Sequence, residues 1–214
     1  MKEKFNLSCS IIVNDQLDVF DIFKRSQKTN KNLKLTAPTR SLNSTSGGIN
    51  FGTLFFAIEG AVESYNLEIS NIMYSNNTVR GIFTVNMLNI NDGTIGSKIF
   101  KDLNNFVLNL GYDKIFAYEL NVRLTIHSNG YLEYPIEKKL KTMKSTKLRS
   151  IKLIDGNNYD MDLREQYISE IGVEELVTNP KMSSVIAVYR REGYNENAVF
   201  DILNDIDTVL ELIR

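Results

Sequence analysis

The sequence is poor in the residues that build metal centres and nucleophilic triads. It contains one cysteine, one histidine and no tryptophan in 214 residues. One cysteine excludes an internal disulfide and a zinc site made of thiolates. The single histidine, His127, has no partner for a His-rich metal site, and its place beside a predicted turn suggests a surface role. We therefore expect no metal, and we expect Cys9, which lies in an apolar run, to be a core residue.

Long apolar runs and an excess of charge are also missing. No segment approaches 18 apolar residues and the first residues lack an apolar core of signal-peptide length, so we expect a cytoplasmic protein without a membrane span. The 25 basic and 26 acidic residues leave a net charge of −1. No global field therefore attracts nucleic acid, and such a partner would need a local patch.

One such patch is the basic segment, residues 138–152. It could bind nucleic acid or the 3′-phosphate of coenzyme A, or it could be a solvated helix face that the following acidic residues balance. No aromatic-rich platform for single strands accompanies it, which argues against nucleic acid. Its cations are Lys138, Lys139, Lys141, Lys144, Lys147, Arg149 and Lys152.

The most informative stretch is residues 88–121. An apolar run leads into a polar, glycine-containing loop, then into an amphipathic stripe, and a second apolar run follows from Lys114 to Leu120. The stripe has helical spacing and Gly111 stands where helices commonly end. The pattern predicts strand, glycine loop, helix, strand. The stripe consists of Ile99, Phe100, Leu103, Phe106, Val107 and Leu110.

Such a unit has a structural and a functional interpretation. It can simply bury one helix face on a sheet. Alternatively, the backbone N–H groups of residues 93–97, at the start of the helix, can hold a phosphate. The stretch by itself favours the structural interpretation, because a short glycine loop is a weak signal.

The remaining chain alternates between strand and helix signals. We expect strands at 5–13, 67–75, 78–90, 147–154, 159–163 and 184–190, and more weakly within 51–65. The second and third form a hairpin around Asn76-Asn77, and the next two form one around residues 155–158. We expect helices after the cap Asn14 or Asp15, at 135–143, at 164–177 and at the C-terminus, and a long loop at 26–50.

These elements predict a mixed α/β (α+β) protein with a mostly antiparallel central sheet flanked by helices. We expect a first domain at residues 1–165 and a C-terminal helix-strand-helix extension at 166–214. The last helix has a narrow apolar face and an acidic back. That face could pack internally, or it could support a partner helix or a homodimer. Its apolar residues are Val199, Ile202, Ile206, Val209 and Ile213.

Three passages resemble the GCN5-related N-acetyltransferase (GNAT) superfamily. Residues 93–121 (GTIGSKIFKDLNNFVLNLGYDKIFAYELN) are similar to its acetyl-CoA loop, following helix and fifth strand. Residues 135–143 (PIEKKLKTM) look like its short helix beside the cofactor. Residues 148–163 (LRSIKLIDGNNYDMDL) resemble the closing hairpin of the ribosomal-protein acetyltransferase branch.

The resemblance implies transfer of an acetyl group from acetyl-CoA to an amine of a protein or small molecule. It places the thioester against the backbone of Leu88 and Ile90, and the pyrophosphate on Gly93, Thr94, Ile95, Gly96 and Ser97. Asn121 would lie near the cofactor at the end of its strand. Glu119 or Tyr118 would remove the proton from the amine. Only one of them can face a given side of the sheet, because successive side chains in a strand point to opposite sides.

The alternative is a protein that keeps this scaffold without catalysis. Asn91-Asp92 stands where the family has Gln or Arg, and the short helix lacks the family's tyrosine. Such a protein would be a binding or assembly component. The abundance of Asn, Lys and Ile suggests an AT-rich genome, compatible with a viral or mobile-element origin.

Overall fold

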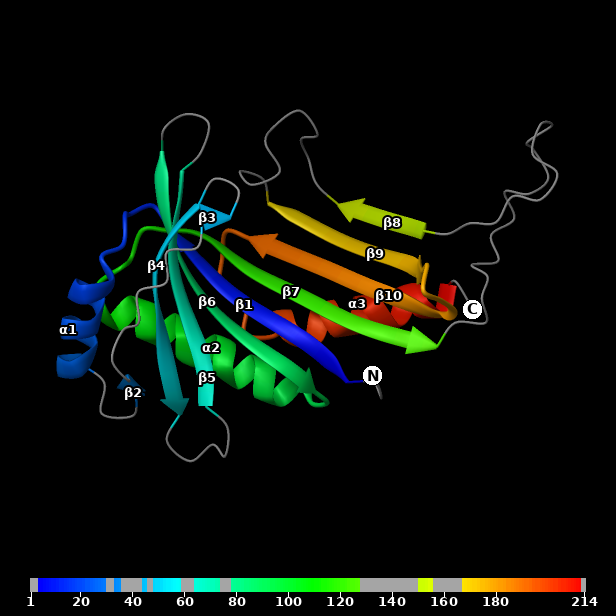
Figure 1. Cartoon of the computed structure of the whole chain (residues 1–214), viewed down its shortest axis with the longest axis horizontal. Coiled ribbons are helices and arrows are strands. Elements are labelled where there is room, and N and C mark those ends of the chain that lie inside the picture. Colours follow the sequence, from blue (N-terminus) through cyan, green and yellow to red (C-terminus); the bar gives the residue numbers. More distant parts are fainter. Residues whose placement is uncertain are drawn as a thin grey trace.

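The computed structural model describes residues 4–29, 33–35, 44–45, 48–58, 64–73, 78–127, 150–155 and 167–212. The described strands form one ten-stranded sheet in which every pairing is antiparallel (Figure 1). Across the sheet the order is β2 (Leu33–Leu35), β4 (Gly48–Ile58), β5 (Ser64–Met73), β6 (Val79–Ile90), β1 (Phe5–Val13), β7 (Ile115–His127), β10 (Asn179–Arg191), β9 (Ile168–Leu176) and β8 (Ser150–Asp155), and β3 (Ser44–Thr45) pairs with β4.

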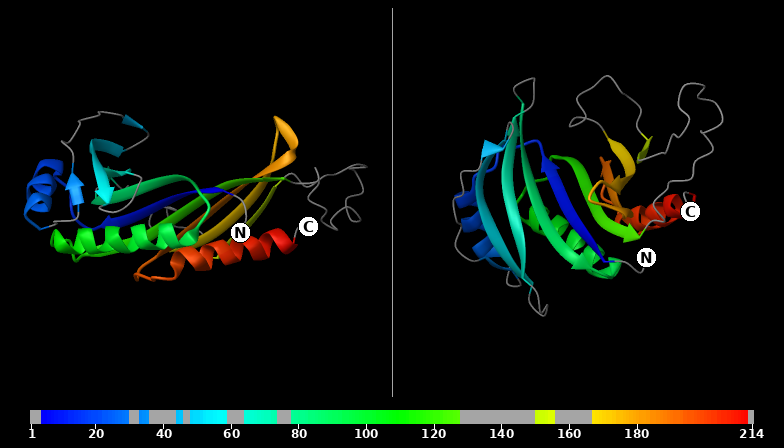
Figure 2. Two further views of the ribbon diagram at one scale, coloured as in Figure 1. Left: turned by 90° about the horizontal axis from the view of Figure 1, so that it is seen from below. Right: turned by 45° about the vertical axis from the view of Figure 1, so that its right-hand side comes forward.

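Two long helices cover one face of this sheet. They are α2 (Gly93–Asn109) and α3 (Ala198–Leu212), which pack against each other at their N-terminal ends and run outward in opposite directions along that face in the left view of Figure 2. The strand residues beneath them are apolar and buried: Leu7, Cys9, Ile11, Phe83, Val85, Leu120 and Val122. No helix in the described ranges covers the opposite side, which we call the uncovered face. Both ends of the sheet bend away from α2 and α3 in the same view, so the uncovered face is concave.

The chain builds the sheet from two halves with the same plan. In the first half, β1 is the inner strand, β4, β5 and β6 then run from the outside inward, and α2 follows. In the second half, β7 is the inner strand, β8, β9 and β10 run inward in the same way, and α3 follows. The halves meet where β1 pairs with β7, so an approximate two-fold axis passes between these strands.

The two long helices repeat the same apolar spacing. Every member of the α2 stripe up to Val107 has a buried apolar counterpart in α3. Because the spacing and the place of each helix in its half agree, the two halves bury their helices in the same way. The pairs are Ile99 and Ile202, Phe100 and Leu203, Leu103 and Ile206, Phe106 and Val209, and Val107 and Leu210.

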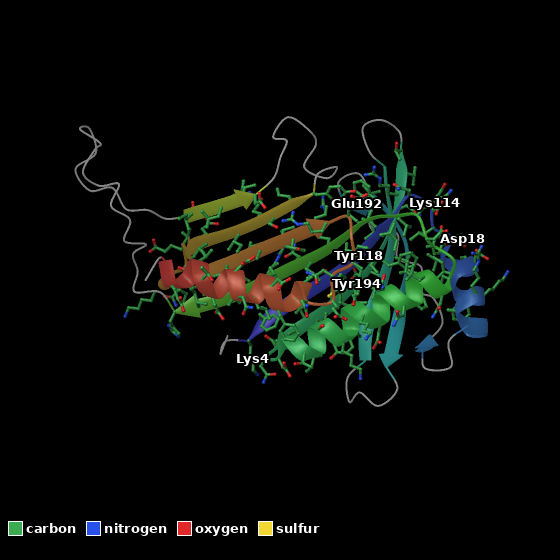
Figure 3. All side chains as sticks on the ribbon, turned by 180° about the vertical axis from the view of Figure 1, so that it is seen from behind. Lys4, Asp18, Lys114, Tyr118, Glu192 and Tyr194 are labelled. Atoms are coloured by element: carbon green, nitrogen blue, oxygen red, sulfur yellow. The ribbon has the colours of Figure 1, made fainter. Side chains whose placement is uncertain are left out.

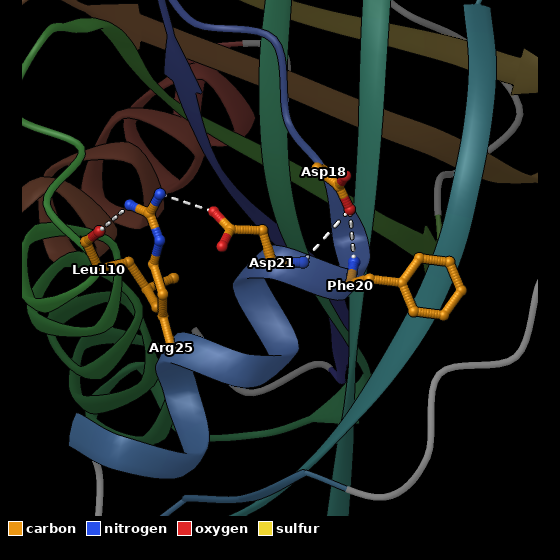
Figure 4. Close-up of polar contacts among 5 residues, drawn as sticks. All are labelled: Asp18, Phe20, Asp21, Arg25 and Leu110. Atoms are coloured by element: carbon orange, nitrogen blue, oxygen red, sulfur yellow. Dashed lines mark hydrogen bonds and ion pairs between the residues drawn. The ribbon is translucent and has the colours of Figure 1, made fainter.

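The first helix, α1 (Val19–Thr29), lies near one end of α2 and is tied to it (Figure 4). Asp18 caps α1, because its Oδ1 accepts hydrogen bonds from the N–H groups of Phe20 and Asp21 at 2.8 and 3.2 Å. Arg25 pairs with Asp21 at 2.6 Å and donates to the carbonyl of Leu110, the C-cap of α2, at 3.2 Å. Arg25 thereby bonds one of the carbonyls that the end of α2 leaves without a helical partner.

Several predicted elements are confirmed. The strand at 5–13, the strand within 51–65, the hairpin of β5 and β6, the helix of the 88–121 unit and the C-terminal helix are present. Gly111 follows the C-cap of α2 with φ of 86°, the left-handed conformation that glycine adopts without strain. The predicted helix 135–143 and strand 159–163 lie outside the described residues.

Other predictions are wrong. Residues 168–176 form strand β9 rather than part of a helix, because β8 and β10 hydrogen-bond to it on both sides. The expected loop 26–50 contains the end of α1 together with β2, β3 and the start of β4. β7 continues to His127, and α1 starts after Asp18 instead of after Asn14 or Asp15.

The sheet extends across the expected domain boundary at residue 165. β10 of the expected extension pairs with β7 along its length, and α3 packs against α2. The described residues on both sides of position 165 therefore share one sheet and one core. The mixed α+β class with an antiparallel sheet is confirmed.

Candidate functional site

The strands that should open around a thioester are not neighbours. β1 lies between β6 and β7 and pairs with both, so that Ser8 faces Asn86 on one side and Asn121 on the other. Ile90, at the end of β6, is buried and pairs with Phe5. A wedge between residues 88–90 and 115–121, which the acetyltransferase resemblance implies, is therefore filled by a hydrogen-bonded strand.

The start of α2 already has partners inside the protein. The Asp92 carboxylate accepts a hydrogen bond from the Thr94 N–H at 2.8 Å, and this bond lowers the pKa of Asp92. Ser97 donates its hydroxyl to the carbonyl of Glu196 at 3.0 Å. A negative charge at the N-cap stabilises the helix, but it repels the phosphate that was expected there.

The two glycines of the expected loop lie in the first turn of α2, where they allow close packing. A Cβ atom on Gly96 would lie 2.4 Å from Cδ2 of Leu7, and one on Gly93 would lie 2.9 Å from Cδ1 of Leu203. The absence of side chains lets α2 approach β1 and α3. Of the other residues expected to bind the cofactor, Thr94 and Ile95 are exposed in the first turn of α2.

Tyr118 and Glu119 point to opposite sides of the sheet, as alternation requires. Tyr118 is buried on the helix side near Tyr194 (Figure 3), and its hydroxyl donates to Oδ1 of Asn104 at 3.0 Å. Burial raises the pKa of Tyr118, and the neighbouring Tyr194 adds to this rise. A buried, protonated phenol with a hydrogen-bond partner has no role as the expected base.

Glu119 lies on the uncovered face and forms an ion pair with Arg190. The Nε and Nη2 atoms of Arg190 lie 2.6 and 2.5 Å from Oε2 of Glu119, and only 13% and 19% of the Arg190 and Glu119 side chains are exposed. Cross-strand pairing of β7 with β10 places the two residues directly opposite each other.

Uncharged polar side chains run across the centre of the uncovered face. They come from three adjacent strands, β6, β1 and β7, at positions that are directly opposite in the register. The Ser10 and Thr84 hydroxyls form a hydrogen bond of 2.9 Å. We call this set the polar ladder; it consists of Ser8, Ser10, Thr84, Asn86 and Asn121.

Apolar and cationic side chains flank the polar ladder. Ile82 of β6 and Val188 of β10 are half-buried, whereas Ile186 of β10 is 38% exposed. Arg123 is exposed on β7 and its Nε reaches Oδ1 of Asn121 at 3.4 Å. The face therefore offers donors, flat aliphatic surface and at least one exposed cation next to one another.

Sequence reasoning identified Asn121 but missed the rest of the polar ladder. The signal was present, because polar residues alternate with buried ones in Phe5–Val13 and in Val79–Ile90. Which strands become neighbours could not be read from that alternation.

His127 lies exposed at the end of β7, and Cys9 is buried, which raises the pKa of its thiol.

Two classes of site find no support in the described part of the chain. Its histidine, cysteine and carboxylate side chains form no group that could hold a metal ion. No helix there has both the length and the apolar character needed to cross a bilayer. Of the seven cations in the basic segment, Lys152 is the one that the structure describes; it lies on β8 and pairs with Glu170 at 2.8 Å.

No protein-family model, curated protein or solved structure matches this chain. The arrangement of its own residues therefore has to carry any functional argument.

Proposed function

We propose that this chain is a non-catalytic binding protein that holds double-stranded DNA against the uncovered face of its sheet. The polar ladder is the observation that carries the proposal. It places uncharged hydrogen-bonding groups in a row across both halves of an antiparallel sheet, with no described helix above them.

The chemistry of the polar ladder suits the minor groove. Every A·T pair presents only acceptors there, adenine N3 and thymine O2. Serine and threonine hydroxyls and asparagine amides can donate to these acceptors, while the aliphatic side chains beside them contact the sugars and the groove walls. Strands are one of the structural elements that proteins use to contact DNA grooves.

The approximate two-fold symmetry of the sheet also supports duplex DNA as the partner. A DNA duplex has approximate two-fold symmetry about each base pair, and proteins with two-fold symmetry match it. The approximate two-fold axis between β1 and β7 would coincide with a two-fold axis of the duplex. Each half of the sheet would then contact the base pairs on one side of that axis. A concave face also favours a rod-shaped partner over a flat one.

Acetyl transfer to an amine remains the competing proposal. It would need acetyl-CoA to displace bonds that the first turn of α2 already makes with Asp92 and Glu196. Of its two expected bases, Tyr118 is buried with its hydroxyl bonded to Asn104, and Glu119 is held in an ion pair with Arg190. We therefore rank DNA binding first.

Fluorescence anisotropy with a short, labelled A·T-rich duplex tests DNA binding. We expect saturable binding that weakens with salt, and we expect Arg123→Ala to weaken it and to reduce the salt slope by about one. Lys101→Ala removes the same charge from an exposed position on α2, on the helix side, and should change neither quantity. Absence of binding at low salt, or equal losses in both variants, would overturn the proposal.

A further inference from the structure

The two halves of the uncovered face carry different side chains at a pair of symmetry-related positions next to the approximate axis. Cys9 and Leu120 occupy the middle of the β1–β7 register, so the approximate axis passes through this pair. Ser8 precedes Cys9 and Glu119 precedes Leu120, so the axis exchanges Ser8 with Glu119.

The outer partners of these residues are exchanged as well. Ser8 pairs with Asn86 of β6, and Glu119 pairs with Arg190 of β10. The first half therefore carries a neutral pair where the second half carries an ion pair.

The other carboxylate oxygen of Glu119, Oε1, has no hydrogen-bond partner among the residues that the structure describes. The Nε and Nη2 atoms of Arg190 both contact Oε2. A carboxylate accepts hydrogen bonds and donates none. On a groove floor that presents only acceptors, Oε1 would be repelled.

The minor groove contains a single kind of base donor, the N2 amino group of guanine. We infer that Glu119 makes the second half of the face select a G·C pair, with Oε1 accepting a hydrogen bond from that amino group. Arg190 is the positioning residue, because it fixes the carboxylate at Oε2. The neutral Ser8 and Asn86 make no such selection. This inference rests on the proposed binding of duplex DNA.

Replacing guanine with inosine tests the contribution of the N2 amino group alone, because an I·C pair lacks this group but otherwise resembles a G·C pair. The probes are two labelled A·T duplexes that differ only in carrying one G·C or one I·C pair. We expect the wild-type protein to bind the G·C duplex about tenfold more tightly, the effect of one hydrogen bond to a charged group. Glu119→Ala should bind both equally. Asn121→Ala, on the same face of the same strand, should weaken binding yet keep the tenfold ratio.

A gain-of-function variant guards against a folding defect in Glu119→Ala. Ser8→Glu combined with Asn86→Arg copies the ion pair to the first half, and should increase the preference for a duplex with two G·C pairs over its I·C counterpart. If the wild-type protein binds DNA with equal affinity for G·C and I·C, the inference about Glu119 is wrong while DNA binding stands. If neither duplex binds, the proposed function itself fails.

Discussion

The side chain of Asn71 in β5 bonds both backbone groups of Leu17. Its Oδ1 accepts from the Leu17 N–H at 2.7 Å, and its Nδ2 donates to the Leu17 carbonyl at 3.0 Å. Both residues are buried. Leu17 lies in the segment between β1 and α1 and touches Gly81 of β6, where a Cβ atom would lie 2.2 Å from Cγ of Leu17. Asn71 therefore fixes that segment on the sheet.

We expect Asn71→Ala to lower the free energy of unfolding by about 1–3 kcal/mol, because it leaves a buried N–H and a buried carbonyl without partners. Urea denaturation followed by circular dichroism measures this loss. Ser70→Ala, on the neighbouring half-buried position of β5, is the control and should change stability by less than about 0.5 kcal/mol. Similar losses in both variants would show that the two bonds contribute nothing specific.

The packing role of Gly96 predicts a second stability difference. We expect Gly96→Ala to destabilise the protein by about 1–3 kcal/mol, since the new methyl group collides with Leu7 and forces α2 away from β1. Gly193→Ala is a matched control, because no atom lies within 4 Å of a Cβ at that position. Thermal unfolding of both variants distinguishes them. A stable Gly96→Ala protein would contradict close packing of α2 on the sheet.

Asp102 of α2 predicts a dependence of stability on pH. Burial raises its pKa, and Lys98 and Lys101 oppose that shift only in part. A raised pKa means that the folded protein binds this proton more tightly than the unfolded chain. The associated stability is present at low pH and is lost as the pH rises through the pKa of the folded state.

We therefore expect Asp102→Asn to unfold at a higher temperature than the wild-type protein at pH 7. The difference should shrink as the pH falls toward the ordinary range of a carboxyl group. Melting curves at a series of pH values provide the measurement. A gain that stayed constant with pH would show that the substitution acts through packing rather than through ionisation.

Titration calorimetry with acetyl-CoA separates the two proposed functions. We expect no saturable heat up to millimolar ligand, because β1 fills the gap between β6 and β7 and α3 packs on the first turn of α2. Micromolar binding would favour acetyl transfer instead. If acetyl-CoA binds, Thr94→Pro should weaken that binding, because it removes an N–H group from the first turn of α2.

Local sequence patterns identify helices and hairpins in this chain. They fail for segments whose secondary structure is determined by the strands that pair with them. The stripe of α2 and the antiparallel pairing of the two strands that flank Asn76-Asn77 have strong local signals, and both are confirmed. Residues 168–176 carry a weak pattern that suits a helix or a strand. Their position between β8 and β10 makes them a strand, because a central strand bonds on both sides.

At the candidate site, too, some features follow from the local sequence and others from the pairing of distant strands. Alternation by itself determined that Tyr118 and Glu119 face opposite sides, because successive side chains in a strand must do so. The composition determined the lack of a second cysteine or histidine for a metal centre. Only the tertiary structure decided that β1 enters between β6 and β7, that Ser8 meets Asn86 and Asn121, and that Arg190 holds Glu119. These contacts join residues far apart in the chain, and the pairing of strands brings them together by rules that no local window of sequence contains.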